Sequence, residues 1–172
     1  MTNWYEVQGK STQADFWSAP MWEGKPRFGP ILLPDGRQVV RVLAAEGTSA
    51  IPFPIWFQQH PDGGKRLGDI LWSAGLSIKI VSQRFVDRLR ELDVHSFQTY
   101  DIELWDRRKK HRIEGYVGFI EDQTGEGEIK INPVAGGKVT LSMICTERVL
   151  HGLLEAGIDQ FDREAFSNFG SK

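Results

Sequence analysis

Two segments of the chain carry apolar residues at helical spacing, and each begins with a hydroxyl residue after a short apolar stretch. The first opens at Ser82 and the second at Thr146. A hydroxyl in this place accepts a hydrogen bond from the first helical turn and marks the start of a helix. The pattern predicts two amphipathic helices, at about residues 82–92 and 146–156.

Shorter stretches with alternating or uniformly apolar residues predict strands. They cover residues 5–8, 31–33, 38–43, 78–81, 100–105, 113–120, 128–132 and 139–144. Residues 34–37 have the composition of a tight turn, and three prolines disfavour regular structure around residues 50–61. Short turns join strands in antiparallel fashion, so we expect an α+β fold with a mainly antiparallel sheet and two helices.

The two strand–helix segments also resemble each other in sequence. Residues 80–97 align without gaps with residues 144–161. The identical pairs are Ile80/Ile144, Arg84/Arg148, Leu89/Leu153, Glu91/Glu155 and Phe97/Phe161. Two interpretations remain open: a duplicated strand–helix unit, or two independent cases of a capped helix that follows a strand.

The chain has the length and composition of one globular domain, residues 1–172. Residues 1–68 are rich in aromatic residues, Pro and Gly, whereas residues 69–161 follow the clearer strand and helix pattern. A chain of 172 residues buries enough of its surface on folding that its core needs neither a metal nor a disulfide. The net charge of −2 provides no overall field that favours nucleic acid or an anionic membrane.

Cysteine content and the start of the chain bear on its location. Cys145 is the single cysteine, which excludes an internal disulfide, and its apolar surroundings favour a core position. The residues after Met1 show no signal-peptide pattern, and every apolar run is shorter than the roughly 18 residues that span a membrane. We therefore expect a cytoplasmic protein that has no membrane partner.

The usual patterns of catalytic and metal sites are missing from the sequence. There is no Gly-x-Ser-x-Gly motif, and the four histidines are scattered along the chain. The glycine-rich stretches 125–127 and 136–138 resemble hairpin turns rather than phosphate-binding loops. We expect no catalytic residue, no metal and no cofactor, which favours a binding protein over an enzyme.

Two groups of residues are candidates for contact with a partner. Aromatic residues lie among turn-forming residues in the first half, and a basic run, residues 107–112, separates two predicted strands. The candidates are Trp17, Trp22, Trp56, Phe57, Arg107, Arg108, Lys109 and Lys110. Trp and Arg dominate the energetics of protein interfaces. Alternatively, the aromatic residues belong to the core and the basic run is a solvated hairpin tip.

Three short motifs resemble a known family. They are residues 69–72 (Asp-Ile-Leu-Trp), 81–84 (Val-Ser-Gln-Arg) and 157–161 (Gly-Ile-Asp-Gln-Phe). Together they resemble immunity family number eleven of bacterial polymorphic toxin systems, formerly a domain of unknown function. The match covers about residues 69–161, and Gln83 replaces the acidic residue usual in the family.

The resemblance implies a cytoplasmic immunity protein that binds and neutralises a cognate protein toxin, without a cofactor or catalytic residues. The alternative is a nucleic-acid-binding accessory domain that uses the basic hairpin, residues 107–112. The slightly negative net charge makes nucleic acid the less favoured partner.

Overall fold

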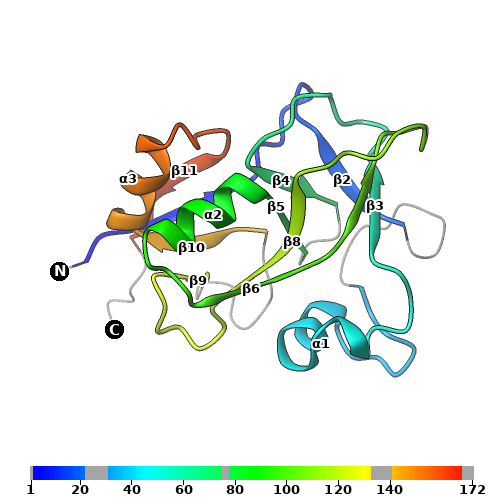
Figure 1. Cartoon of the computed structure of the whole chain (residues 1–172), viewed down its shortest axis with the longest axis horizontal. Coiled ribbons are helices and arrows are strands. Elements are labelled where there is room, and N and C mark those ends of the chain that lie inside the picture. Colours follow the sequence, from blue (N-terminus) through cyan, green and yellow to red (C-terminus); the bar gives the residue numbers. More distant parts are fainter. Residues whose placement is uncertain (1, 22–30, 75–77, 133–140, 168–172) are drawn as a thin grey trace.

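A computed structural model describes residues 2–21, 31–74, 78–132 and 141–167, and confirms the predicted α+β class (Figure 1). The described residues form three α-helices and eleven strands in two mostly antiparallel sheets. The helices are α1 Val39–Glu46, α2 Gln83–Glu91 and α3 Glu147–Glu155, and a 3-10 turn spans Thr48–Ala50. The strands are β1 Trp4–Gln8, β2 Trp17–Pro20, β3 Trp56–Gln59, β4 Ile70–Ser73, β5 Lys79–Ser82, β6 Phe97–Tyr100, β7 Glu103–Trp105, β8 Tyr116–Glu121, β9 Ile129–Ile131, β10 Met143–Thr146 and β11 Asp162–Ala165.

The larger sheet, in the order β6-β8-β5-β4-β2-β3-β7, curls on itself. Its two terminal strands, β6 and β7, are consecutive in the chain and only Asp101 and Ile102 separate them. In addition, the Ile113 amide donates to the Leu104 carbonyl, so β7 pairs with the segment that leads into β8. The curled sheet encloses one apolar cluster, and Val39, Val42 and Leu43 of α1 complete it.

The smaller sheet has the order β11-β1-β10-β9. Figure 1 shows α2 and α3 side by side. A second apolar cluster is formed by buried residues of these two helices and of strands from both sheets. Strands from residues 1–68 pair with strands from the later part: β1 with β10 and β11, β2 with β4, and β3 with β7. The compositional boundary near residue 68 therefore does not separate two structural units.

The repeated sequence corresponds to two equivalent structural units. The first unit is β4-β5-α2-β6 and the second is β9-β10-α3-β11. In both, the cap hydroxyl accepts from the amide three residues later, Ser82 from Phe85 at 3.2 Å and Thr146 from Val149 at 3.4 Å. The neighbour order β6-β8-β5-β4 matches β11-β1-β10-β9, so β8 and β1 occupy corresponding places.

Each unit contains the same carboxylate–arginine pair at its helix start. Arg84 Nε lies 2.7 Å from Asp69 of the first unit, and Arg148 pairs with Glu128 of the second. The cap hydroxyl donates to the same carboxylate, at 2.8 Å in the first unit and 3.1 Å in the second. Asp69 and Glu128 directly precede β4 and β9, so one geometry is built twice from different acids.

The same arginines also connect the two units. Arg84 Nη2 donates to the carbonyl of Gly157, just beyond the end of α3, at 3.4 Å. Arg148 Nη1 donates to the carbonyl of Leu92, at the end of α2, at 2.9 Å. A cation at a helix C-terminus satisfies carbonyls that have no intrahelical partner. The arginine at the start of each helix thus contacts the end of the other helix, and these two contacts hold α2 and α3 together at both ends.

Both predicted helices and their caps are confirmed, but the strand predicted at residues 38–43 is wrong, because α1 lies there. The run of β-branched residues misled the prediction. Val39, Val42 and Leu43 lie on one helical face and are buried. Burial of each is worth about 1.5–3 kcal/mol, whereas helix propensities differ by less than about 1 kcal/mol per residue.

Several other strand predictions need correction. Residues 31–33 contribute only an isolated bridge, Leu32 to Gln38. β3 lies within the proline-rich stretch 50–61, which was expected to be irregular. The strand predicted over 100–105 is interrupted where the sheet curls, and the one predicted at 139–144 is β10, Met143–Thr146, with residues 139 and 140 outside the described ranges.

Candidate functional site

Four tryptophans lie on the outer face of the larger sheet, along β4-β2-β3-β7. Each is half-buried: Trp72, Trp17, Trp56 and Trp105. Their neighbours along the strands point to the opposite face and are buried: Leu71, Ser73, Phe16, Ser18, Phe57 and Leu104. Side chains alternate between the two faces of a strand, so the four indoles share the face that points away from the core. We call these four residues the tryptophan face.

One half of the tryptophan face is held rigidly by its surroundings. Trp17 and Trp72 are paired across β2 and β4, with ring centroids 5.0 Å apart. The Trp17 indole donates to the Thr12 carbonyl at 3.1 Å. Gly63 packs on Trp17 so closely that a Cβ there would lie 2.8 Å from the Trp17 backbone nitrogen. These contacts fix the ring without burying it.

The other half combines two indoles with a cation. The Lys109 ammonium lies 4.4 Å from the ring centroid of Trp56 and 5.7 Å from that of Trp105. A cation over an indole face is attracted by the negative face of the ring, and the effect is largest for Trp. The Trp105 indole donates to Glu103 at 3.0 Å, which orients the second ring. Lys109 therefore joins two tryptophans that come from different strands.

The basic run forms a hairpin tip, as predicted. We call residues 107–112 the basic tip; the bridge between Trp105 and Arg112 closes it. Asp106 organises the turn, since its carboxylate accepts from the Lys110 amide at 2.6 Å and lies 3.2 Å from His111. The backbone hydrogen bond from Lys110 lowers the pKa of Asp106. Lys109 adopts a φ of 51°, so the turn holds this residue in a left-handed conformation.

The cations of the basic tip have different contacts. Arg107 is anchored, because its amide donates to the Gln59 side chain at 3.2 Å and its guanidinium to the Pro61 carbonyl at 3.4 Å. Arg112 lies 3.3 Å from Glu114. Arg108 and Lys110 are exposed, and within the described ranges no acidic side chain lies at ion-pair distance from either. Two cations at the end of the tip thus remain open to solvent.

The structure brings most of the sequence candidates together. Trp56 and Lys109 are in contact, and Arg107 packs on the end of β3. Phe57 is fully buried in the core of the curled sheet, which corrects its place among surface candidates. Trp22 lies outside the described residues. Trp72 and Trp105 were not among the candidates, although each alternates with a buried leucine, the signal of a side chain on the outer face.

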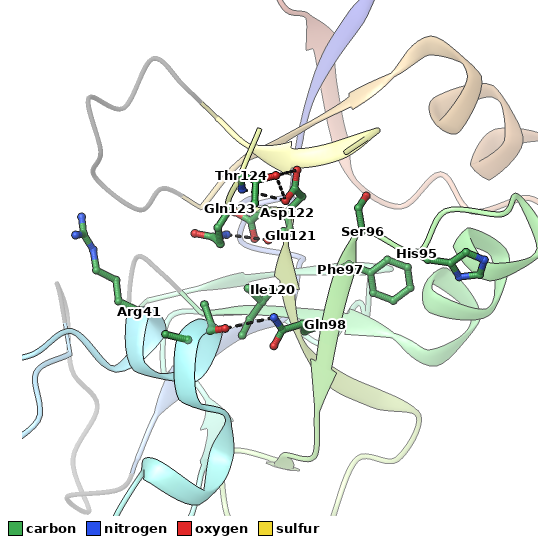
Figure 2. A pocket seen from close by; sticks show the side chains of 12 residues that line it. Arg41, His95, Ser96, Phe97, Gln98, Ile120, Glu121, Asp122, Gln123 and Thr124 are labelled. Atoms are coloured by element: carbon green, nitrogen blue, oxygen red, sulfur yellow. Dashed lines mark hydrogen bonds between the residues drawn. The ribbon is translucent and has the colours of Figure 1, made fainter. Parts of the chain in front are cut away.

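An open groove of about 650 Å³ lies between α1 and the β6–β8 pair (Figure 2). Its polar side chains bond to one another or to the backbone: Thr124 to Asp122, Gln123 to the Glu121 carbonyl, and Gln98 to the Ala44 carbonyl. Figure 2 shows Arg41 and His95 on opposite sides of the groove. These polar side chains therefore bond to one another or to the backbone, and they do not converge on one point in the groove.

A buried ion pair connects β5 and β8, two neighbouring strands of the larger sheet. Lys79 Nζ is 2.7 Å from Glu121, and the two side chains are 2% and 3% exposed. Burial raises the pKa of the neighbouring Tyr100 hydroxyl, which keeps it protonated. Burial also raises the pKa of the Cys145 thiol to about 12, consistent with a core cysteine.

Comparison with known proteins finds no matching family model and no match among curated proteins. The immunity-family resemblance thus depends on the motifs of residues 69–161. In the ranges that the structure describes, no three His, Cys, Asp or Glu side chains are grouped to hold a metal. Nor is any described helix long and apolar enough to cross a membrane.

Proposed function

We propose that this protein binds a cognate bacterial toxin directly and neutralises it in the cytoplasm, as an immunity protein does. The tryptophan face supports the proposal: four half-buried indoles lie on paired strands beside an exposed basic tip. The motif resemblance of residues 69–161 supports the kind of partner, and the tryptophan face supports the choice of contact surface. Catalysis by this chain is not part of the proposal.

Physical arguments favour this surface for protein binding. Tryptophan is the residue most enriched among the few that carry binding energy at interfaces. Strand-borne rings are ordered before binding, so association costs little conformational entropy. In contrast to an isolated exposed aromatic residue, Trp17 is fixed by Thr12 and Trp72, and Trp56 by Lys109.

The test combines a rescue assay with measured binding. The polypeptide encoded beside this gene is expressed in cells with wild-type protein, and growth and the dissociation constant are measured. We expect rescue by the wild type, and Trp56→Ala to weaken binding by about 30-fold or more, as interface tryptophans do. Leu32→Ala is the matched control, since Leu32 is an exposed apolar residue outside this face. A folded Trp56→Ala protein with unchanged affinity and full rescue would contradict the assignment of the surface.

A second candidate, nucleic-acid binding, is favoured by one observation. Arg108 and Lys110 flank Lys109, whose ammonium lies over two indoles, and single-strand binders combine basic grooves with aromatic platforms. Such binding weakens steeply as salt concentration rises. Titration with oligothymidylate at two salt concentrations tests it, and micromolar binding that salt abolishes would support this candidate instead.

A further inference from the structure

We infer that the basic tip recognises carboxylates, so that the partner presents an acidic protein segment beside an apolar patch. The inference rests on the proposed function and names the partner chemistry of the same surface. In this arrangement the tryptophan face contacts the apolar patch. Arg108 and Lys110 contact the carboxylates, and Lys109 is a positioning residue between them.

The cations of the basic tip differ in their contacts. The Arg107 backbone and guanidinium are bound to Gln59 and Pro61, and the Lys109 ammonium lies over Trp56. The charges of Arg108 and Lys110 are left for an external anion. Exposed cations at the rim of an apolar patch raise the association rate and select partners of opposite charge.

Hydrogen bonds within the basic tip fix its conformation before a partner binds. Asp106 accepts from the Lys110 amide and lies beside His111, which holds both ends of the turn. Lys109 has a positive φ, and its ammonium lies over the two indoles. Non-glycine residues adopt this conformation at a cost of about 1–2 kcal/mol. The contact with the two rings offsets part of that cost.

The position of Lys109 and the net charge of the chain favour a protein over a nucleic acid as the partner. A base stacks on an open ring face, but Lys109 lies over Trp56 at 4.4 Å and over Trp105 at 5.7 Å. With a net charge of −2, the chain has no overall positive field that attracts an extended polyanion, whereas a few carboxylates interact only with the local cations. These features favour an acidic protein segment.

The experiment uses the full chain and defined probes. A short synthetic peptide of Glu and Leu, its counterpart with Gln in place of Glu, and oligothymidylate are titrated while indole and arginine side-chain NMR signals are followed. We expect the Glu peptide to shift the Trp56, Trp105 and Arg108 signals. The Gln peptide should bind about tenfold more weakly.

Two charge-reversed proteins complete the design. Arg108→Glu/Lys110→Glu should lose at least tenfold in affinity for the Glu peptide. Arg90→Glu/Arg163→Glu, at exposed sites on α2 and β11, carries the same change in net charge and should bind as the wild type does. Lys109→Met, which keeps the side-chain stem but removes the charge, should alter the two indole signals and leave the carboxylate contacts of Arg108 intact.

The outcomes separate the two proposals. Equal binding of the Glu and Gln peptides, unchanged affinity in Arg108→Glu/Lys110→Glu, or a preference for oligothymidylate would overturn the inference. If the tip variant still binds the neighbouring polypeptide and rescues cells, the proposed function stands and the inference fails. If the wild type fails to rescue but binds the Glu peptide through the tip, the proposed function fails and the inference stands.

Discussion

The two strand–helix units share their local geometry but differ in what surrounds them. In both, a cap hydroxyl, an arginine and a carboxylate form the same contacts at the helix start. Farther along the strand, Lys79 of the first unit corresponds to Met143 of the second, and both are buried. Lys79 requires Glu121 as a partner, whereas Met143 packs in an apolar cluster. The contacts at the helix start thus depend on local sequence. Whether the strand carries a lysine or a methionine at this buried position depends on the partner that the surrounding sheet provides.

The largest difference between the units should come from the buried ion pair. Glu121→Ala leaves the Lys79 ammonium buried without its carboxylate, which typically costs about 3–5 kcal/mol. We expect urea unfolding, followed by tryptophan fluorescence, to show a loss of that order. Lys79→Met/Glu121→Leu gives the first unit the methionine of the second, and should restore stability to within about 1–2 kcal/mol of the wild type. A double variant as unstable as Glu121→Ala would contradict this account.

The next difference concerns the two equivalent carboxylates. Asp69 is 2% exposed and Glu128 is 39% exposed in their ion pairs. Asp69→Ala removes charged hydrogen bonds to Ser82 and Arg84 and should cost about 2–3 kcal/mol. Glu128→Ala should cost less than about 1 kcal/mol, because water replaces an exposed partner. Chemical denaturation of both variants checks the ratio, and equal losses would show that burial does not distinguish the units.

The ends of the two helices allow a smaller, reciprocal test. Asp93 and Gly157 occupy corresponding positions after α2 and α3, with φ values of 58° and 70°. Glycine adopts this conformation without strain, and no atom lies within 4 Å of a Cβ at Gly157. We expect Gly157→Asp to lower the melting temperature and Asp93→Gly to raise it. The free energy of unfolding should change by about 1 kcal/mol or less in each variant. Changes of the same sign in both variants would rule out backbone strain as the cause.

The smallest effect should appear in the pH dependence of stability. The hydrogen bond from Arg148 lowers the pKa of Glu128 below its ordinary value in the unfolded chain. A carboxylate with a lowered folded-state pKa adds stability above its unfolded-state pKa of about 4.3, and loses it as pH falls through the folded-state value. Arg148→Met should therefore flatten the stability profile below about pH 5. An unchanged acid slope in this variant would show that other carboxylates set the profile.

Sequence patterns predicted the elements whose signals are local. The caps Ser82 and Thr146 and the helices that follow them depend on contacts within one turn, so their prediction succeeded. The helix α1 was missed because its valines favour a strand in isolation, and only the distant sheet that it covers selects the helix. The curl of the larger sheet depends on pairs such as β3 with β7, which short-range patterns do not reveal.

The candidate surface was predictable only in part, for a similar reason. The basic tip between two strands followed from the sequence, and Trp17 and Trp56 stood out among turn residues. Phe57 adjoins Trp56, yet one is in the core and the other on the outer face, and this choice depends on which side of β3 the core occupies. The contact of Lys109 with two indoles needs the parallel pairing of β3 with β7 and left no signal in the sequence.

Hydrogen–deuterium exchange of the complex with the polypeptide encoded beside this gene tests the central claim most directly. Binding through the tryptophan face should slow amide exchange in β3, β7 and the basic tip, and leave the outer turns of α2 and α3 unchanged. Protection confined to α2 and α3, or a stable complex with no protection at β3 and β7, would contradict the proposed binding surface.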